Sequence, residues 1–332
     1  LSKAAQEGGL PVFHSALRQD YDVVSAWRLA RFLAAEKIAV VHSHHSRSHG
    51  VCLLAKFFLS LSNEAGVAPV LVVSRRVSFA VGKNPFSLWK YRSGLIDSFI
   101  AVADAVKDVL VSCGVDAGRV AVIRSGVNVK QFAPRSADPA ILKELKIPQG
   151  VPLIGKIANF SPWKGQSAFL EAAALLVAKK RPVHFLLAGR DTDGPWVRAE
   201  VARLGLEKHV TLAGFRSDIP SLLPCLSVSV NAAIKGEGLS GALRESLCMG
   251  IPIVASYIAG NRELLSKSGT DFLFPAGQAK VLAERIEWVL DHPQQAKAVV
   301  SDWRTRVSED FSIEQTIDKT AALYLRLTES AR

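Results

Sequence analysis

The sequence has few cysteines and no long apolar segment. Its four cysteines are scattered over 332 residues and form no C-x-x-C pair. We therefore expect reduced, buried thiols, as in a cytosolic protein, rather than a disulfide framework. No run of about 18 uncharged apolar residues occurs, so we expect no transmembrane helix.

Acidic residues are also in deficit. The chain has 30 Asp and Glu against 41 Lys and Arg, a net charge of +11. Residues 1–150 hold 19 basic and 11 acidic residues, so 19 − 11 = +8 of that charge lies in the front half. Such an excess indicates an anionic partner, which could be nucleic acid, anionic lipid or a phosphorylated substrate.

Short β-branched runs alternate with longer helical patterns along the whole chain. This alternation predicts parallel sheets covered by helices, and two series of runs predict two doubly wound α/β domains. The front series is VFHSA (12–16), AVVHSHH (39–45), PVLVVS (69–74), SFIAVAD (98–104) and VAVIRSG (120–126). The back series is PLIGKIAN (152–159), VHFLLAG (183–189), HVTLAGF (209–215), LSVSVNAA (226–233), PIVASY (252–257) and FLFPAG (272–277).

The domain boundary should lie in KELKIPQGVP (143–152), where prolines and a glycine interrupt any element. We therefore predict a front domain over 1–148 and a back domain over 149–308. The last segment, 309–332, has apolar residues at helical spacing and should be an amphipathic helix packed on the body.

Two polar clusters follow predicted strands of the back domain, where ligands bind in open α/β sheets. After 152–159, Lys164 falls in the first turn of a predicted helix, whose free N–H groups favour an anion. Taken alone, Lys164 fits a solvated lysine better. After 226–233 comes KGEGLSGALRESLCMGIPIVAS (235–256), which places Glu237 in a glycine-rich loop and Glu245 inside a helix. Carboxylates accept paired hydrogen bonds from sugar hydroxyls, so the glycines, the strand end and the anion site together favour a ligand site over two surface glutamates.

EGLSGALRE followed by SLCMGIPIVAS resembles the E-x7-E block of family 4 glycosyltransferases, retaining enzymes of group 1 type and GT-B fold. VIRSGVNVKQF, IANFSPWKGQ and LAGFRSDIPSLL resemble further family elements, in family order. The resemblance implies two Rossmann-like domains around a cleft, with the acceptor in front and the nucleotide-sugar behind. It implies that Glu245 binds the ribose and that Glu237 binds the donor sugar, near the backbone amides of Gly238, Leu239 and Ser240. Lys164 would bind the diphosphate, and Phe215 and Arg216 would flank the base.

Three departures from the family pattern stand out. The arginine usual five residues before the K-G lysine is Asn159 here, so Arg190 or Arg244 would replace that cation. The slot of a frequent front-domain histidine holds Arg75, which cannot act as a base and should instead hold an anion. The family's first front-domain strand and Gly-rich loop are not found. We therefore expect the start of the front domain to be absent from this chain, which could leave an inactive fragment.

Other clusters have competing interpretations. HSHHSRSH (42–49) has the spacing of metal ligands, but a polar loop facing the acceptor fits better. DTD (191–193) matches a metal-binding D-x-D motif, yet it reads as a solvated turn. RRVSFAVGKNPFSLWKYR (75–92) interleaves basic and aromatic residues, as at an anionic membrane surface. A helix packed on the core with its basic residues outside fits that segment equally well.

The sequence thus predicts a metal-independent retaining glycosyltransferase. Its donor would be a UDP- or GDP-linked sugar, and it would need no cofactor. Its acceptor would be an anionic or lipid-linked glycan, such as a lipopolysaccharide core or polysaccharide precursor. The protein would be cytoplasmic, peripheral on the inner face of the membrane, and would not bind nucleic acid. The alternatives are a nucleotide-sugar 2-epimerase of GT-B fold and a non-catalytic binding protein derived from a transferase domain.

Overall fold

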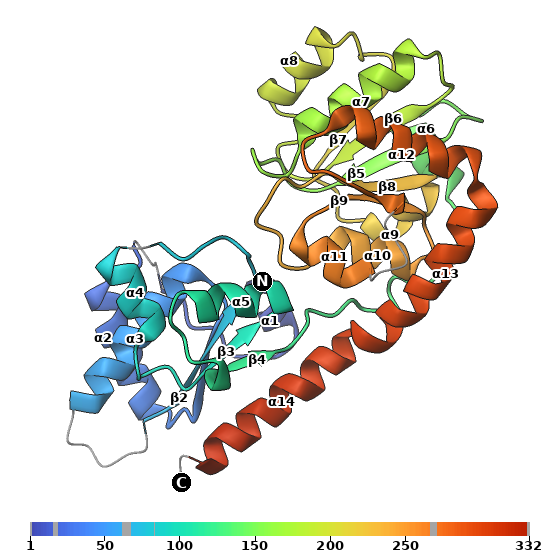
Figure 1. Cartoon of the computed structure of the whole chain (residues 1–332). Coiled ribbons are helices and arrows are strands. Elements are labelled where there is room, and N and C mark those ends of the chain that lie inside the picture. Colours follow the sequence, from blue (N-terminus) through green and yellow to red (C-terminus); the bar gives the residue numbers. More distant parts are fainter. Residues whose placement is uncertain (1, 16–18, 62–67, 83, 266–270, 331–332) are drawn as a thin grey trace.

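The computed structural model describes the chain except residues 1, 16–18, 62–67, 83, 266–270 and 331–332. The described residues form two α/β domains, each built on a parallel sheet, and the last helix returns from the second domain to the first (Figure 1). The predicted fold class is therefore confirmed.

The front sheet runs in sequential order, β1-β2-β3-β4, with all described neighbours parallel. Its strands are β1 (Val40–Ser43), β2 (Val70–Arg75), β3 (Ser98–Ala101) and β4 (Val120–Val122). The helices of this domain are α1 (Ser2–Glu7), α2 (Val23–Ala35), α3 (Ser46–Leu61), α4 (Pro85–Arg92) and α5 (Asp104–Ser112), with the 3-10 turn η1 (Ala117–Arg119) before β4.

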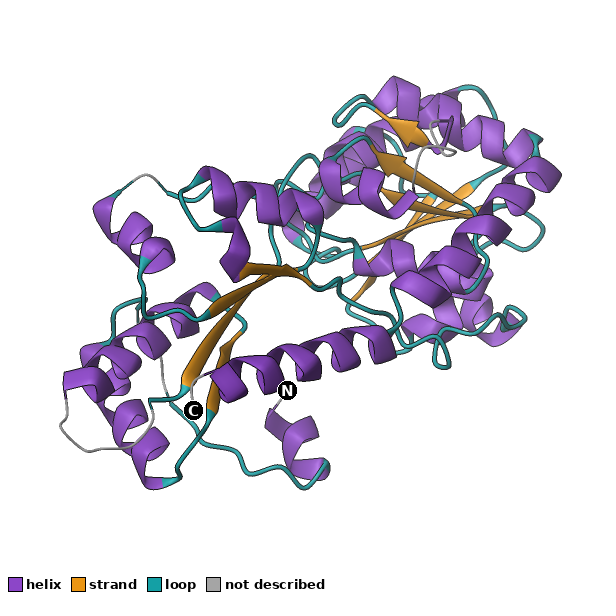
Figure 2. Ribbon diagram, turned by 60° about the horizontal axis from the view of Figure 1, so that its bottom comes forward, coloured by secondary structure: helices purple, strands orange, loops and turns teal. Residues whose placement is uncertain are grey.

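The two faces of the front sheet have different covers. Leu71, Val73 and Phe99 alternate along β2 and β3 and pack in one core with residues of α3 and α5. Val70, Val72 and Ile100 point to the opposite face, where the described cover includes Leu323 and Tyr324 of α14 (Ile313–Ser330). Figure 2 shows α14 lying along the front-domain strands. The C-terminal helix therefore supplies part of the front domain's core.

The back sheet has the order β10-β9-β8-β5-β6-β7, so the strand order reverses between β5 and β8. The strands are β5 (Leu153–Ile157), β6 (His184–Ala188), β7 (Val210–Gly214), β8 (Val228–Asn231), β9 (Ile253–Ser256) and β10 (Leu273–Phe274). The helices are α6 (Pro139–Glu144), α7 (Gln166–Ala178), α8 (Pro195–Arg203), α9 (Ile219–Leu222) with η2 (Leu223–Cys225), α10 (Gly241–Cys248), α11 (Ala259–Leu265), α12 (Ala279–Asp291) and α13 (Pro293–Asp310). A reversal of this kind leaves a crevice at the strand ends, where α/β proteins bind ligands.

One predicted strand is wrong. Residues 12–15 of VFHSA have no strand structure, and residue 16 lies outside the described residues. The Phe13 ring instead stacks on Phe32 of α2, with ring centroids 4.9 Å apart. The apolar Phe13 of this run thus packs against a helix, and the run does not pair with a sheet. Each of the other ten predicted segments contains a strand.

Candidate active site

The lysine loop follows β5 at the switch point of the back sheet. Gly165 has a φ of +72°, and a Cβ there would lie 1.8 Å from the Ala232 carbonyl oxygen, so the position requires glycine. The Ile234 amide donates to the Trp163 carbonyl at 2.8 Å. The turn before α7 is therefore fixed against the loop after β8, which sets Lys164 at the crevice.

The glutamate loop follows β8 and lies opposite. Glu237 has a side chain only 7% exposed, and Lys164 donates from Nζ to its Oε1. Residues 73 positions apart are thus joined in an ion pair where the sequence predicted a joint site. The pair neutralises both groups in the free protein.

The start of α10 carries the second carboxylate. Ser240 caps this helix by accepting from the Leu243 amide, and it also accepts from the Asn231 amide nitrogen at 2.8 Å. Glu245 lies one turn further along and is half-buried, which raises the pKa of its carboxyl despite the nearby Arg244. A half-buried carboxylate gains from hydroxyl donors, as the vicinal hydroxyls of a ribose would supply.

Arg244 is buried in the first turn of α10. The residue is 7% exposed, and its Nη1 has no hydrogen-bond partner among the described residues. Burial lowers the pKa of this side chain to about 10, while Glu245 and Glu237 oppose that shift. A buried cation with a spare donor beside Lys164's partner suits a diphosphate. Arg190 and Arg244 are the two predicted replacements for the missing family arginine, and Arg244 is the one buried beside Glu237 with a donor unpartnered in the described part of the chain.

The front domain closes directly on the glutamate loop. Val77 forms an antiparallel bridge with Glu237, and the Ser78 hydroxyl donates to the Glu237 carbonyl at 3.0 Å. A Cβ on Gly238 would lie 2.6 Å from the Arg76 carbonyl oxygen, so no other residue fits there. Leu239 packs against both domain cores. These glycines therefore permit domain contact as well as ligand approach.

The residues expected near the base lie around the ends of β6 and β7. Arg190 stacks on Phe215, with its guanidinium 5.3 Å from the ring centroid, and Phe215 is 64% exposed. Asn159 accepts from the Arg190 amide at 3.0 Å and so ties the lysine loop to this pair. Arg216 instead forms ion pairs with Asp218 and Glu144. The exposed Phe215 ring, with Arg190 on one face, is suited to stacking on a base. Arg216 is less suited to contact a ligand, because two carboxylates already neutralise its charge.

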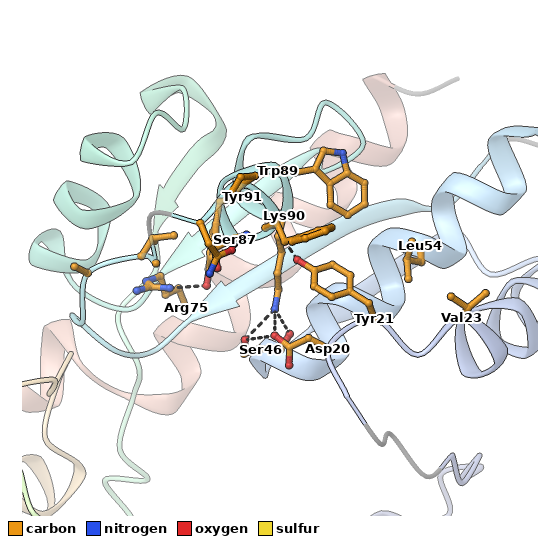
Figure 3. A pocket seen from close by; sticks show the side chains of 16 residues that line it. Asp20, Tyr21, Val23, Ser46, Leu54, Arg75, Ser87, Trp89, Lys90 and Tyr91 are labelled. Carbon is orange, nitrogen blue, oxygen red and sulfur yellow. Dashed lines mark hydrogen bonds and ion pairs between the residues drawn. The ribbon is translucent and has the colours of Figure 1, made fainter.

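Arg75 lies apart from the Lys164–Glu237 pair. It is 9% exposed, donates to the Tyr91 hydroxyl at 2.6 Å and to the Phe79 carbonyl, and lies over the Tyr91 ring. It lines a front-domain cavity of about 980 Å³ (Figure 3). Its link to the donor loop is indirect, because Phe79 touches Trp163 edge-on at 5.7 Å between centroids.

Sequence reasoning missed two groups at the site. Lys156 on the central strand β5 is fully buried, and burial lowers its pKa to about 7, with Glu237 opposing the shift. The only signal was a lysine inside the otherwise apolar run LIGKI. Glu263 on α11 joins the domains by accepting from the Asp104 amide and from Arg124, both at 2.8 Å. Nothing in the local sequence pattern marks this contact.

The histidine run and the D-x-D motif have structural partners. His42 bonds to Tyr324 of α14 and, at 2.7 Å, to Ser74 of β2. In the described ranges no three His, Cys, Asp or Glu side chains are grouped as a metal would require. Asp191 and Asp193 flank the turn after β6, where Thr192 is buried and donates to the Gly189 carbonyl at 2.8 Å.

Two basic residues of the 75–92 segment, Arg75 and Lys90, are buried, whereas Arg76 and Arg92 are exposed. Lys90 is 3% exposed and pairs with Asp20 at 2.8 Å, and Arg92 donates to the Cys113 carbonyl at 2.7 Å. Among its four aromatic residues, Phe86 and Trp89 are exposed, at 70% and 41%. Lys83 lies outside the described residues. The interpretation with basic residues outside is therefore wrong for Arg75 and Lys90. None of the described helices is long and apolar enough to cross a bilayer.

Solved structures share the fold over nearly the whole chain. A glycosyltransferase from Rickettsia africae superposes with a TM-score of 0.84 at 21% identity, covering 98% of this chain and 87% of that one. HepE from Anabaena, in complex with UDP and glucose, superposes with a TM-score of 0.81 at 20% identity, covering 97% and 88%. At such identities the likeness concerns the fold alone.

Curated relatives match the sequence over parts of the chain that differ in length. A 2-deoxystreptamine glucosyltransferase from Streptomyces kanamyceticus is 29% identical over 59% of this chain and 52% of its own length. An Escherichia coli UDP-Gal:α-D-GlcNAc-diphosphoundecaprenol α-1,3-galactosyltransferase is 23% identical over 92% of this chain and 79% of its own length. For two further relatives the chain spans about half their length, 52% and 56%.

Two family models match the two domains. The model described as Glycosyltransferase Family 4 matches residues 3–131, and the model described as Glycosyl transferases group 1 matches residues 138–305, which is more than half of the chain. The latter match includes the lysine loop, the glutamate loop and α10. The chain therefore belongs to the group 1 glycosyltransferase family.

Proposed function

We propose that this protein transfers a sugar, with retention, from a UDP- or GDP-linked donor to a lipid-linked or anionic glycan acceptor. The observation that carries the proposal is the cluster at the β5/β8 switch point, where Lys164, Glu237, Arg244 and Glu245 converge. It holds two cations for a diphosphate and two carboxylates for hydroxyls, all on the family's donor side.

Each residue has a separate task in this proposal. Glu245 accepts from the ribose hydroxyls, and Phe215 with Arg190 holds the base. Lys164 moves from Glu237 to the diphosphate, so that Glu237 becomes free to accept from a hydroxyl of the donor sugar. The departing nucleoside diphosphate gains negative charge as the sugar leaves, and Lys164, Arg244 and the N-terminus of α10 stabilise that charge. These groups neutralise the leaving group by themselves, so the proposed transfer needs no metal.

The acceptor is proposed from charge and from one relative. The front half carries +8 of the net charge, and the E. coli relative's name specifies a diphosphoundecaprenol-linked acceptor. Phe86 and Trp89, together with Val23, Val24 and Trp27 of α2, expose large apolar side chains on the front domain. We propose that this apolar surface holds the protein peripherally on the inner face of the cytoplasmic membrane.

The proposal is tested by binding and by turnover in two variants. Glu245→Ala should weaken UDP or GDP binding by about 1.5–3 kcal/mol, roughly 10- to 150-fold, because the ribose loses a charged acceptor. Glu237→Gln should bind free nucleotide at least as tightly as the wild type, because no buried carboxylate loses its partner, and it should lose transfer. Glu207→Ala, an exposed position outside the site, is the control. Calorimetry measures binding, and product analysis over UDP- and GDP-sugars measures transfer.

The same assays separate the alternatives. Transfer should survive EDTA, and loss restored by manganese would contradict the metal-free leaving-group stabilisation. A sugar nucleotide recovered as its 2-epimer would indicate an epimerase. Nucleotide binding with neither transfer nor hydrolysis, across donors and acceptors, would indicate a binding protein. Unchanged nucleotide affinity in Glu245→Ala would overturn the ribose assignment.

A further inference from the structure

A second site lies in the front domain, around Arg75. The cavity there measures about 980 Å³, at the upper end of the roughly 300–1,000 Å³ of small-molecule sites. It is bounded by β2, α4 and the starts of α2 and α3. The nucleotide groups assigned above are all in the back domain, so this cavity is free for a different ligand.

The charges in the cavity are unequally compensated. Lys90 donates to Asp20 at 2.8 Å and to the carbonyl and hydroxyl of Ser46 at 2.6 and 2.9 Å, so it has three acceptors, one of which is a counter-ion. Arg75 donates to the Tyr91 hydroxyl and to the Phe79 carbonyl, and both of these acceptors are neutral. Its Nε is buried and has no hydrogen-bond partner among the described residues. Arg75 is thus a buried cation with a spare donor, which an anion would complete.

The rest of the lining is largely apolar and aromatic. In Figure 3, Arg75 lies at one side of the cavity, and Val23 and Leu54 lie at the other, with Tyr21 between them. Tyr21 is 5.9 and 6.2 Å from the rings of Phe86 and Trp89, and both of these rings are exposed at the rim. A ligand that fills this space would have an anion at one end and a hydrocarbon part at the other.

We propose that this cavity binds the head and first hydrocarbon units of an isoprenoid-type lipid phosphate or diphosphate, with the anion on Arg75 and the chain on Tyr21, Phe86 and Trp89. The inference rests on the proposed function, because it gives the acceptor its lipid anchor and its binding residues. The exposed rim rings would cover the chain where it leaves the cavity for the bilayer.

The cavity is connected to the donor loop through a short segment. Arg75 donates to the carbonyl of Phe79, whose ring would contact any Cβ at Gly236 and lies against Trp163. Between them, Val77 pairs with Glu237. A lipid phosphate at Arg75 would therefore hold its attached glycan on the side of the crevice where the donor sugar lies.

The test is calorimetric titration of the full chain with farnesyl phosphate below its critical micelle concentration, with farnesol and with inorganic phosphate. Farnesyl phosphate should bind at least tenfold more tightly than either part alone. Arg75→Gln should lose at least tenfold for farnesyl phosphate and leave farnesol unchanged. Trp89→Ala, which removes an exposed ring, should weaken farnesyl phosphate and farnesol alike.

Two control variants and one control ligand make the outcome decisive. Arg31→Gln and Trp196→Ala remove an exposed arginine and an exposed tryptophan outside the cavity, and they should change nothing. Equal losses in these controls, or farnesyl phosphate binding no better than phosphate, would overturn the proposal. If Arg75→Gln does not fold, the Trp89→Ala and Trp196→Ala pair decides. UDP is titrated on the same samples. If UDP binds and farnesyl phosphate does not, only the lipid-phosphate proposal is rejected. If farnesyl phosphate binds and UDP does not, only the donor-site proposal is rejected.

Discussion

Arg244 should lower the stability of the free protein and raise its affinity for the donor. Its guanidinium is buried in the first turn of α10, Nη1 has no partner among the described residues, and burial lowers its pKa from its ordinary value to about 10. A ligand diphosphate would supply the missing acceptor. Arg244→Met keeps much of the side-chain volume and removes only the charge and its donors, so it separates these two effects.

The magnitudes follow from this environment. Lowering the pKa of this arginine to about 10 corresponds to about 3 kcal/mol of disfavoured charge. The hydrogen bond lost with the side chain, Nε to the Ser240 carbonyl at 3.3 Å, is worth about 1 kcal/mol. The free protein should therefore gain about 2 kcal/mol, which raises Tm by about 4–8 °C. Nucleoside diphosphate affinity should fall by about 1.5–3 kcal/mol, or roughly 10- to 150-fold.

Differential scanning calorimetry of the free protein and titration with UDP and GDP measure the two effects. Arg203→Met, at a side chain 60% exposed on α8, is the matched control and should change neither quantity. Uridine, which lacks phosphate, should bind wild type and Arg244→Met equally. A variant that melts several degrees lower and binds UDP normally would show that Arg244 is structural, and the diphosphate assignment would be refuted.

Two further predictions concern the same crevice. Burial lowers the pKa of Lys156 from 10.5 to about 7, so between pH 7 and 10.5 the unfolded chain binds a proton that the folded protein does not. The free energy of unfolding should therefore rise with pH over this range, by at most about 1.4 kcal/mol per pH unit. Lys156→Met should be more stable at pH 7 and lose this rise, as urea unfolding at pH 7 and 9 would show; parallel pH profiles would contradict the buried charge. Gly238→Ala should abolish transfer and keep nucleotide binding, since its Cβ meets the Arg76 carbonyl at 2.6 Å, whereas Gly241→Ala, with 3.7 Å to its nearest neighbour, should retain transfer. Equal transfer by both variants would show that close approach of the front domain at Gly238 is not required.

The sequence predicted the elements and the two back-domain loops because both depend on local chemistry. The strand runs and the Ser240 cap each reflect a backbone preference that neighbouring residues show, whereas the need for glycine at 165 and 238 comes from the distant carbonyls of Ala232 and Arg76. The switch point then brings the ends of β5 and β8 together, so Lys164 and Glu237 could be expected to meet without any contact information.

What the sequence could not give depends on contacts distant in the chain. Phe13 stacks on a helix where its pattern indicated a strand, because burial against Phe32 serves an alternating apolar residue as well as a sheet does. The sequence predicts Lys90 as a surface cation, but its ammonium donates to Asp20, 70 residues away. Residue type fixes charge, but only the fold decides whether a charge faces solvent or a counter-ion.

The preformed Lys164–Glu237 pair bears on donor selectivity. An anion without a sugar can draw Lys164 away, but it leaves Glu237, with its side chain 7% exposed, without a partner, and an unpaired buried carboxylate is costly. A nucleotide sugar presents a phosphate to Lys164 and a hydroxyl to Glu237 at the same time. Each partner of the ion pair then gains a new polar contact in place of the one it loses. The pair would therefore favour the complete donor over free diphosphate, and the front-domain strand segment at Val77 would keep Glu237 in place during the exchange. Glu237 thus takes part both in the proposed donor binding and in the contact between the two domains. The glutamate loop therefore connects the position of the front domain to the proposed transfer.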